Sequence, residues 1–181
     1  MTAADRPDPA PAGVPIWLLD VDGVLNAVCH PAQPPKTWSR WESGSAYAGG
    51  ERFVITFAPE LMAGIRDLHD SAAVEVRWLT TWGHDANAGL RDLLGLPVFP
   101  VAGEPQRASA WWKLPCALRA AAECRPMIWT DDDLGYSATA QRWAAELGIL
   151  AIAPDPSAGL TPADFECIRA FCAQPSAVGE P

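Results

Sequence analysis

Acidic and hydroxyl side chains stand where the apolar runs of this sequence end. One run ends at Asp20, with Asp22 two residues later; a second ends at Thr80 and Thr81, and a third at Asp131, the first of three consecutive aspartates. If these ends meet in the fold, the clustered carboxylates disfavour joint ionisation unless a cation binds among them. A small set of hard oxygen ligands suits Mg²⁺ better than Zn²⁺, which prefers His and Cys. The residue types therefore predict a magnesium site.

The elements that must position these residues are indicated by the spacing of the apolar side chains. Short apolar runs, typical of strands buried on both faces of a sheet, alternate with segments of helical periodicity. The runs predict five strands, at 14–19, 74–79, 98–101, 127–130 and 149–152. The segments between them predict helices at 59–69, 86–94, 108–124 and 137–147, and a last helix to residue 171 follows an N-cap at Thr161. The expected fold class is therefore α/β, a Rossmann-like parallel five-stranded sheet with helices on both faces.

This architecture also predicts where the chemistry takes place. In open parallel sheets, ligands bind in the crevice at the carboxyl ends of the strands. The aspartates and threonines stand at those ends of the first, second and fourth predicted strands. We therefore expect them to converge on one site.

One long segment, 26–56, interrupts the alternation between the first strand and the first helix. Loops of this length inside compact domains are usually functional or disordered. This segment contains Trp38 and Trp41 and ends in the β-prone run 52–57, which favours a folded flap, such as a β-hairpin, over disorder. Because it leaves the sheet beside Asp20, it should border the site entrance, where its tryptophans either contact substrate or pack into the core.

The predicted elements lie between residues 14 and 172, a length that fits a single domain. The first flanking segment, 1–13, is rich in Pro, and the last, 173–181, contains Pro, Ser and Gly. Such segments bury too little apolar surface to offset the entropy lost on ordering. We expect both ends to be disordered.

The segment Asp20-Val21-Asp22-Gly23-Val24 resembles the first motif of the haloacid dehalogenase (HAD) superfamily, D-x-D-G-[TV]. The resemblance covers most of the chain, about 14–152, and implies a HAD-like fold in which the flap is a small cap. In the family, the first Asp attacks phosphorus and the second protonates the leaving group. This implies that Asp20 is the nucleophile and Asp22 the general acid and base. Family members also use the backbone carbonyl of the second Asp as a metal ligand.

The second and third motifs of the family have counterparts in the same order along the chain. The apolar run 76–80 resembles the second motif, which implies that the hydroxyl of Thr80 holds the transferring phosphoryl group, with Thr81 as its rival. The third motif is a lone Lys or Arg that neutralises the phosphate and the nucleophile, and by position it falls on Lys113. The implied phosphate-binding residues are therefore Thr80, Thr81 and Lys113.

The run 127–132 resembles the fourth motif, an apolar strand that closes on paired acids and binds Mg²⁺. The resemblance implies that Asp131 is the first candidate for a direct metal ligand and Asp132 the second, whereas Asp133 could instead cap a turn. Together with the first motif, the implied metal ligands are Asp20, Asp22, Asp131 and Asp132.

The function implied by these motifs is that of a magnesium-dependent phosphohydrolase, a phosphomonoesterase that forms an aspartyl-phosphate intermediate. Dehalogenases of the superfamily lack an acid at the position of Asp22, because carbon–halogen cleavage needs no leaving-group proton. Phosphate-ester chemistry is therefore expected here, on a small phosphorylated substrate.

Two other functions compete with this one. The spacing of Trp78, Thr80 and Trp82 resembles, more loosely, a small bacterial group of the superfamily associated with RNA repair, which implies a nucleotide or nucleic-acid end as substrate. However, 22 acidic and 13 basic residues give a net charge of -9, which does not attract a phosphate backbone or an anionic membrane. The third alternative is a catalytically silent HAD-fold module that binds a partner through the flap.

The composition also bears on the compartment. No segment approaches the roughly 20 apolar residues of a membrane-spanning helix, and the first fifteen residues lack the apolar core of a signal peptide. A cytoplasmic protein without membrane contact is therefore expected. The five cysteines are odd in number and show no C-x-x-C spacing, so we expect reduced thiols, most of them in the core.

Overall fold

The main element of the computed structural model, which describes residues 13–105 and 111–174, is a parallel sheet of four strands. The strands are β1 (Ile16–Leu19), β4 (Glu75–Trp78), β5 (Met127–Thr130) and β6 (Leu150–Ile152), in the spatial order β4-β1-β5-β6. Each neighbouring pair is parallel, and β1 lies between β4 and β5. The predicted α/β class and parallel sheet are confirmed.

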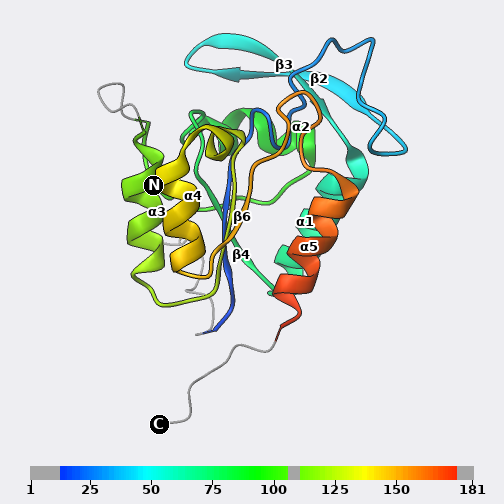
Figure 1. Cartoon of the computed structure of the whole chain (residues 1–181). Coiled ribbons are helices and arrows are strands. Elements are labelled where there is room, and N and C mark those ends of the chain that lie inside the picture. Colours follow the sequence, from blue (N-terminus) through cyan, green and yellow to red (C-terminus); the bar gives the residue numbers. More distant parts are fainter. Residues whose placement is uncertain (1–12, 106–110, 175–181) are drawn as a thin grey trace.

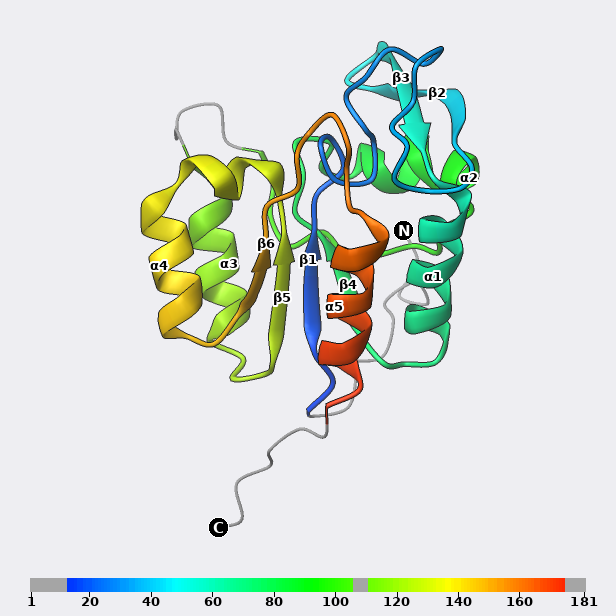
Figure 2. The same ribbon diagram turned by 45° about the vertical axis from the view of Figure 1, so that its right-hand side comes forward.

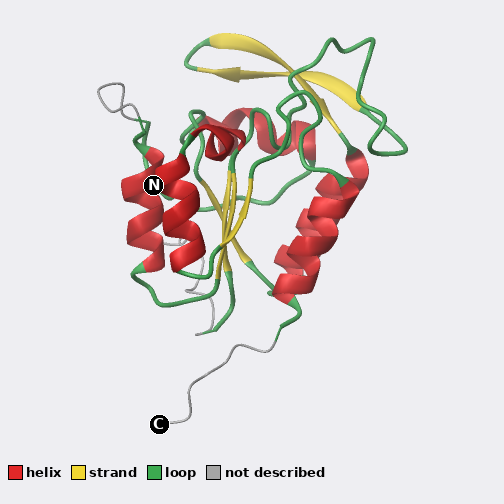
Figure 3. Cartoon of the chain, viewed as in Figure 1, coloured by secondary structure: helices red, strands yellow, loops and turns green. Residues whose placement is uncertain are grey.

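Helices cover both faces of this sheet (Figures 1 and 2). On one side lie α1 (Pro59–Asp70) and α5 (Pro162–Cys172), and on the other lie α3 (Lys113–Ala121) and α4 (Ala138–Glu146). Figure 3 shows the resulting three layers, with the strands between two sets of helices. Shorter helical segments at the carboxyl end of the strands are η2 (Ala86–Leu90), α2 (Arg91–Leu94) and η3 (Asp132–Tyr136).

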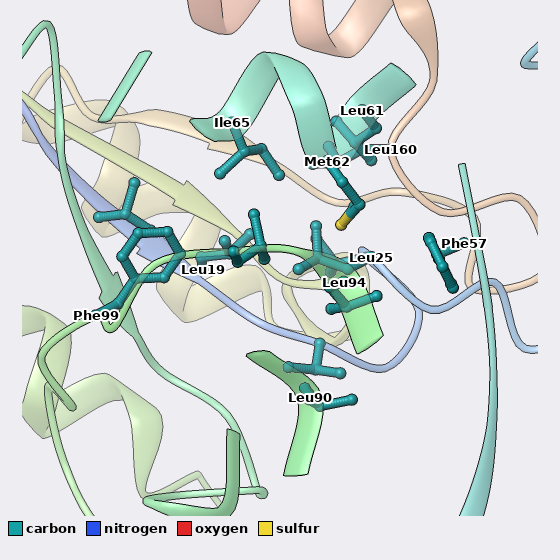
Figure 4. Packing of buried hydrophobic residues seen from close by; sticks show 14 of the residues in the cluster. Leu19, Leu25, Phe57, Leu61, Met62, Ile65, Leu90, Leu94, Phe99 and Leu160 are labelled. Atoms are coloured by element: carbon teal, nitrogen blue, oxygen red, sulfur yellow. The ribbon is translucent and has the colours of Figure 1, made fainter. Parts of the chain in front are cut away.

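The core divides into two apolar clusters because successive side chains of a strand point to opposite faces. In β1, Trp17 and Leu19 join the cluster of α1 and α5, whereas Ile16 and Leu18 join the cluster of α3 and α4. Figure 4 shows the first cluster, in which helix α1 packs above Leu19. All four side chains of β1 are fully buried, so the strand that delivers Asp20 is held on both faces.

The predicted fifth strand, 98–101, is wrong. The segment makes only an isolated parallel bridge between Trp78 and Val101. Two backbone hydrogen bonds join this region to β4, from Trp78 N to Pro100 O at 2.8 Å and from Ala102 N to Trp78 O at 2.8 Å. Proline supplies no N–H to a strand ladder; Pro100 lies inside this run and Pro97 directly precedes it. The described sheet therefore has four strands and ends at β4.

Two predicted helices also differ from the structure. The segment 86–94 is divided into a π-helical turn and one short α-helix, η2 and α2, and α3 covers only Lys113–Ala121 of the predicted 108–124. Residues 106–110 lie outside the described part of the chain, as do residues 1–12 and 175–181 of the two predicted tails. The N-cap at Thr161 is confirmed, because its side chain and that of Asp164 form a complete capping box.

The insertion 26–56 contains an antiparallel β-hairpin formed by β2 (Glu42–Ala48) and β3 (Glu51–Phe57). Its two-residue turn is Gly49-Gly50, where both glycines have positive φ angles of 58° and 83°, as the turns that match strand twist require. The hairpin lies across the carboxyl end of the parallel sheet (Figures 1 and 3). A folded flap at the predicted entrance is therefore present.

The tryptophans before the hairpin pack against the core. The Nε1 of Trp38 donates a hydrogen bond to the carbonyl of Leu160 at 2.7 Å, and its ring lies 6.4 Å from that of Phe165. Trp41 also packs against the apolar cluster of α1 and α5. Of the two roles open to Trp38, the structure therefore favours packing over substrate contact.

We expect Trp38→Ala to lower the free energy of unfolding by on the order of 3 kcal/mol, because it removes a large packed ring and an indole hydrogen bond. Urea unfolding measures this loss. The control is Tyr47→Ala, since Tyr47, in the hairpin that follows Trp38, is 61% exposed and removal of its side chain should change stability by no more than about 0.5 kcal/mol. Equal unfolding midpoints for the two variants would contradict the packing role.

The cysteines and helices of the described residues bear on the remaining expectations. All five cysteines are free, as expected, but Cys124 and Cys167 are exposed and only Cys116 is buried, so the expectation of mostly core thiols is wrong. Within the described ranges, the helices lack the combination of length and apolar character that crossing a bilayer requires.

Candidate active site

The loop after β1 brings Asp20 to the centre of the sheet's carboxyl edge. The backbone N–H of Asp20 donates to Thr130 O at 3.1 Å, and its Oδ1 accepts from Val21 N at 2.7 Å. Gly23 turns the chain with a φ of 71°, and a Cβ there would lie 2.4 Å from Cγ of Asp132. A glycine is therefore required both by the backbone conformation and by the carboxylate that lies against it.

A buried ammonium group joins two of the predicted acids. The Nζ of Lys113, the first residue of α3, forms an ion pair with Asp20 and a second with Oδ2 of Asp131 at 2.9 Å. All three residues are at most 5% exposed. Buried charges persist when they are paired, so α3 contributes its lysine to a charge cluster made by the ends of β1 and β5.

The turn after β5 adds a third carboxylate. Asp131 begins the η3 turn, and its Oδ1 accepts from the backbone N–H of Asp133 at 3.1 Å. Carboxylate oxygens of Asp20, Asp131 and Asp132 all lie within 4.8 Å of one another. Asp133 itself is exposed. The structure thus brings together three of the four predicted metal ligands.

The charges in this cluster do not balance. When ionised, three carboxylates and one ammonium leave two negative charges in a largely buried site. Burial, followed by repulsion from Asp20, raises the pKa of Asp131 to about 7. Burial also raises the pKa of Asp20 and of Asp132, whereas Lys113 opposes both shifts. A divalent cation would neutralise the excess charge, and the hard oxygen donors fit Mg²⁺.

We expect the metal-free protein to melt at a lower temperature at pH 8 than at pH 6. The pKa of Asp131 in the folded chain is raised from an ordinary 3.8 to about 7, so this stabilising contribution is complete at low pH and is lost as the pH rises through about 7. Each kcal/mol changes the melting temperature of a chain of this size by about 2 to 4 °C.

Thermal unfolding in chelator at the two pH values measures the difference. Mg²⁺ at pH 8 should remove most of it, because the cation stabilises the ionised carboxylates. Asp131→Asn should also reduce it. A metal-free melting temperature that rises between pH 6 and pH 8 would show that the cluster does not hold a proton as described.

The two predicted threonines have different environments. Thr80 is fully buried, its side chain interacts with the carboxylate of Asp20 and lowers the pKa of that group, and its hydroxyl accepts from the backbone N–H of Trp82 at 3.3 Å. Thr81 is exposed. The geometry therefore places Thr80 against the candidate nucleophile and favours it over Thr81 for contact with a bound phosphoryl group.

The carboxylate of Asp22 belongs to a separate hydrogen-bonded group. Its Oδ2 accepts from Nε1 of Trp82 at 2.8 Å, and its Oδ1 accepts from Nδ2 of Asn26 at 2.7 Å. The Oδ1 of Asn26 in turn accepts from the backbone N–H of Thr56, at the end of the hairpin, at 2.8 Å. The side chain of Asp22 is thus absent from the three-carboxylate cluster, and any metal contact from this residue would come from its backbone carbonyl.

Neither Trp82 nor Asn26 was predicted to hold Asp22. Asn26 follows the first motif by a few residues, and that proximity was the available signal. Trp82 lies 60 positions from Asp22, and only the folded chain shows the contact.

Two neighbouring polar residues have surface or structural roles. His84 is exposed and pairs with Glu104 at 2.8 Å. Asp85 precedes a helical turn but does not cap it with its side chain; its Oδ2 accepts instead from the backbone N–H of Gly49 at 2.7 Å. Asp85 therefore fastens the tip of the hairpin to the segment that follows Thr80.

Comparisons of the chain with protein-family models, with curated proteins and with solved structures give no match. The case for a function therefore depends on the geometry and chemistry of the site.

Proposed function

We propose that this chain is a magnesium-dependent phosphohydrolase of the HAD type, with a HAD-like fold and Asp20 as the nucleophile. The observation that carries the proposal is the buried contact of Lys113 with both Asp20 and Asp131. A third carboxylate, that of Asp132, lies beside these two. A structural core gains little from burying several like charges. Binding of a cation and an anionic phosphoryl group would explain why the three carboxylates and the lysine are clustered there.

The carboxylates of Asp20, Asp131 and Asp132 are the residues that would hold Mg²⁺. When bound, the ion supplies positive charge that stabilises the phosphoryl oxygens during transfer. Lys113 adds a fixed positive charge beside the nucleophile, and its ion pair lowers the pKa of Asp20 and so opposes the effect of burial, which favours the protonated carboxyl. An ionised carboxylate is the form that attacks phosphorus.

The reaction proceeds in two steps. An oxygen of Asp20 attacks phosphorus and forms an aspartyl-phosphate, while Asp22 protonates the departing oxygen of the ester. Asp22 then takes a proton from the water that attacks the same phosphorus, which releases phosphate and restores Asp20. Thr80 is buried, and its side chain interacts with the carboxylate of Asp20, so it lies within the region where the phosphoryl group must bind.

The hairpin acts in this proposal as a small cap over the carboxyl edge of the sheet. A small phosphate monoester is the substrate class that fits the acidic character of the chain, with a net charge of -9. Nucleic-acid ends carry many backbone phosphates that such a charge repels. The proposed substrate is therefore a phosphorylated small molecule.

Hydrolysis of p-nitrophenyl phosphate with and without Mg²⁺ tests this function. We expect release of p-nitrophenol that depends on Mg²⁺, and parallel assays with phosphorylated metabolites and end-phosphorylated oligonucleotides should favour the metabolites. Turnover confined to the oligonucleotides would identify a nucleic-acid end phosphatase. Failure to hydrolyse any ester would contradict the proposal and favour the silent binding module.

A further inference from the structure

Asp22 is held by neutral donors that come from two different parts of the chain. The indole of Trp82 and the amide of Asn26 each bond one oxygen of its carboxylate, at 2.8 and 2.7 Å. Among the described residues, no Lys, Arg or His forms an ion pair with Asp22. The orientation of this carboxylate therefore depends on where the indole and the amide are placed.

The indole of Trp82 is itself fixed by the hairpin. Trp82 is 6% exposed, and the ring of Phe53 in β3 packs on it with 5.3 Å between centroids and an interplanar angle of 60°. Phe53 remains 41% exposed. An aromatic side chain at the solvent boundary thus supports the ring that supports Asp22.

The hairpin is also anchored to the segment that carries Trp82. The backbone N–H of Gly49 at the hairpin tip donates to Asp85, and the carbonyl of Tyr47 lies so close to Gly89 that a Cβ there would approach it to 2.4 Å. These contacts join Asp85 and Gly89, which both follow Trp82 in the chain, to the hairpin turn and to β2. The positions of hairpin and indole are therefore set together.

We propose that Trp82 is a positioning residue for Asp22, and that Phe53 of the hairpin holds the indole in the orientation this requires. The inference rests on the proposed phosphoryl transfer and concerns one event within it. As a bond forms between phosphorus and an oxygen of Asp20, the bond from phosphorus to the leaving oxygen breaks and its electron pair goes to that oxygen. The leaving oxygen takes the proton of Asp22.

This event matters more for some esters than for others. An alkoxide is too basic to leave without a proton, whereas p-nitrophenolate leaves readily as an anion. Mispositioning of Asp22 should therefore slow alkyl esters selectively. The value of kcat/KM isolates the effect, because it reports on the steps up to formation of the aspartyl-phosphate and not on its breakdown.

The test compares kcat/KM for glycerol 2-phosphate and for p-nitrophenyl phosphate, with Mg²⁺, in wild-type protein and three variants. Trp82→Phe keeps a ring but removes the N–H, Phe53→Leu removes the supporting ring without touching Trp82, and Trp78→Phe is the control. The control removes another buried indole donor, which bonds Asn87 at 3.0 Å and no carboxylate of the site.

For Trp82→Phe we expect kcat/KM to fall at least about tenfold on glycerol 2-phosphate and less than about threefold on p-nitrophenyl phosphate. Phe53→Leu should change the ratio in the same direction by a smaller factor, and Trp78→Phe should leave it unchanged. Melting curves identify any variant that has lost the fold. If Trp82→Phe does not fold, the ratio measured for Phe53→Leu tests the positioning role instead.

The outcomes separate this inference from the proposed function. Wild-type protein that hydrolyses neither ester overturns the proposed function and the positioning role with it. Wild-type protein that hydrolyses both esters, with Trp82→Phe and Phe53→Leu reducing both equally or neither, overturns the positioning role alone. A change of ratio in Trp78→Phe as large as that in Trp82→Phe also overturns it, because a general loss of packing would then explain the effect.

Discussion

Asp20→Asn should reduce turnover by at least about three orders of magnitude while leaving the fold intact. The amide is nearly isosteric with the carboxylate but cannot form an acyl phosphate. Asp20 lies at the end of a fully buried strand and its Oδ1 accepts from a backbone N–H, and an amide oxygen retains that bond. Steady-state hydrolysis of p-nitrophenyl phosphate, with a melting curve for each protein, measures both effects.

The matched control is Asp133→Asn, the same substitution at an exposed aspartate of the neighbouring acidic turn. Its rate should stay within about threefold of the wild type, because the Asp133 side chain lies outside the three-carboxylate cluster. If Asp20→Asn retained more than about a tenth of the wild-type rate, Asp20 would not be the nucleophile.

Removal of divalent metal should have an effect of similar size. Excess chelator should abolish turnover and Mg²⁺ should restore it, because two unbalanced negative charges would otherwise repel an anionic phosphoryl group. Asp131→Asn should raise the Mg²⁺ concentration for half-maximal rate by at least about tenfold, since Asp131 contributes a buried oxygen to the cluster. Asp133→Asn again serves as the control and should leave the Mg²⁺ dependence unchanged.

Turnover that continues at the full rate in excess chelator would contradict the proposed role of the three carboxylates. A second contradiction would be equal Mg²⁺ requirements for Asp131→Asn and Asp133→Asn. The acidic turn would then act as a loop without contact to the ion.

The positions of the site residues could be predicted from sequence where a buried strand ends in polar residues. The apolar runs before Asp20, Thr80 and Asp131 predicted three strands of one parallel sheet, and parallel strands place their carboxyl ends at one edge. The structure adds that the three strands are neighbours, in the order β4-β1-β5. Lys113 was selected by its place in a resemblance, and it lies in contact with Asp20 and Asp131. The end of a buried strand is a local feature, an apolar run followed by polar residues, and it can therefore be recognised in the sequence.

Contacts between distant segments could not be predicted in this way. The support of Asp22 by Trp82, and of Trp82 by Phe53, depends on how the hairpin lies over the sheet. The bond between Asp85 and Gly49 depends on the same arrangement. Apolar periodicity describes which face of an element is buried, and it carries no information on which partner covers that face.

The error at the fifth strand has a different cause. The run 98–101 has the apolar composition of a strand, but Pro100 inside it lacks a backbone N–H donor, as does Pro97 directly before it. The missing N–H groups favour an edge segment over a paired strand at this position. Similarly, Trp38 was open to two roles until its bond to Leu160 and its contact with Phe165 favoured packing.

The central claim, that Asp20 becomes phosphorylated, is tested most directly by trapping the intermediate in the Asp22→Asn variant. p-Nitrophenolate leaves without a proton, but breakdown of the aspartyl-phosphate then lacks its base, so the intermediate should accumulate. After reaction with ³²P-labelled p-nitrophenyl phosphate and an acid quench, we predict a protein-bound label that hydroxylamine removes and that maps to the peptide containing Asp20. The label should be absent from the double variant Asp20→Asn, Asp22→Asn. A label on another residue, or release of p-nitrophenol without any protein-bound phosphate, would contradict the account.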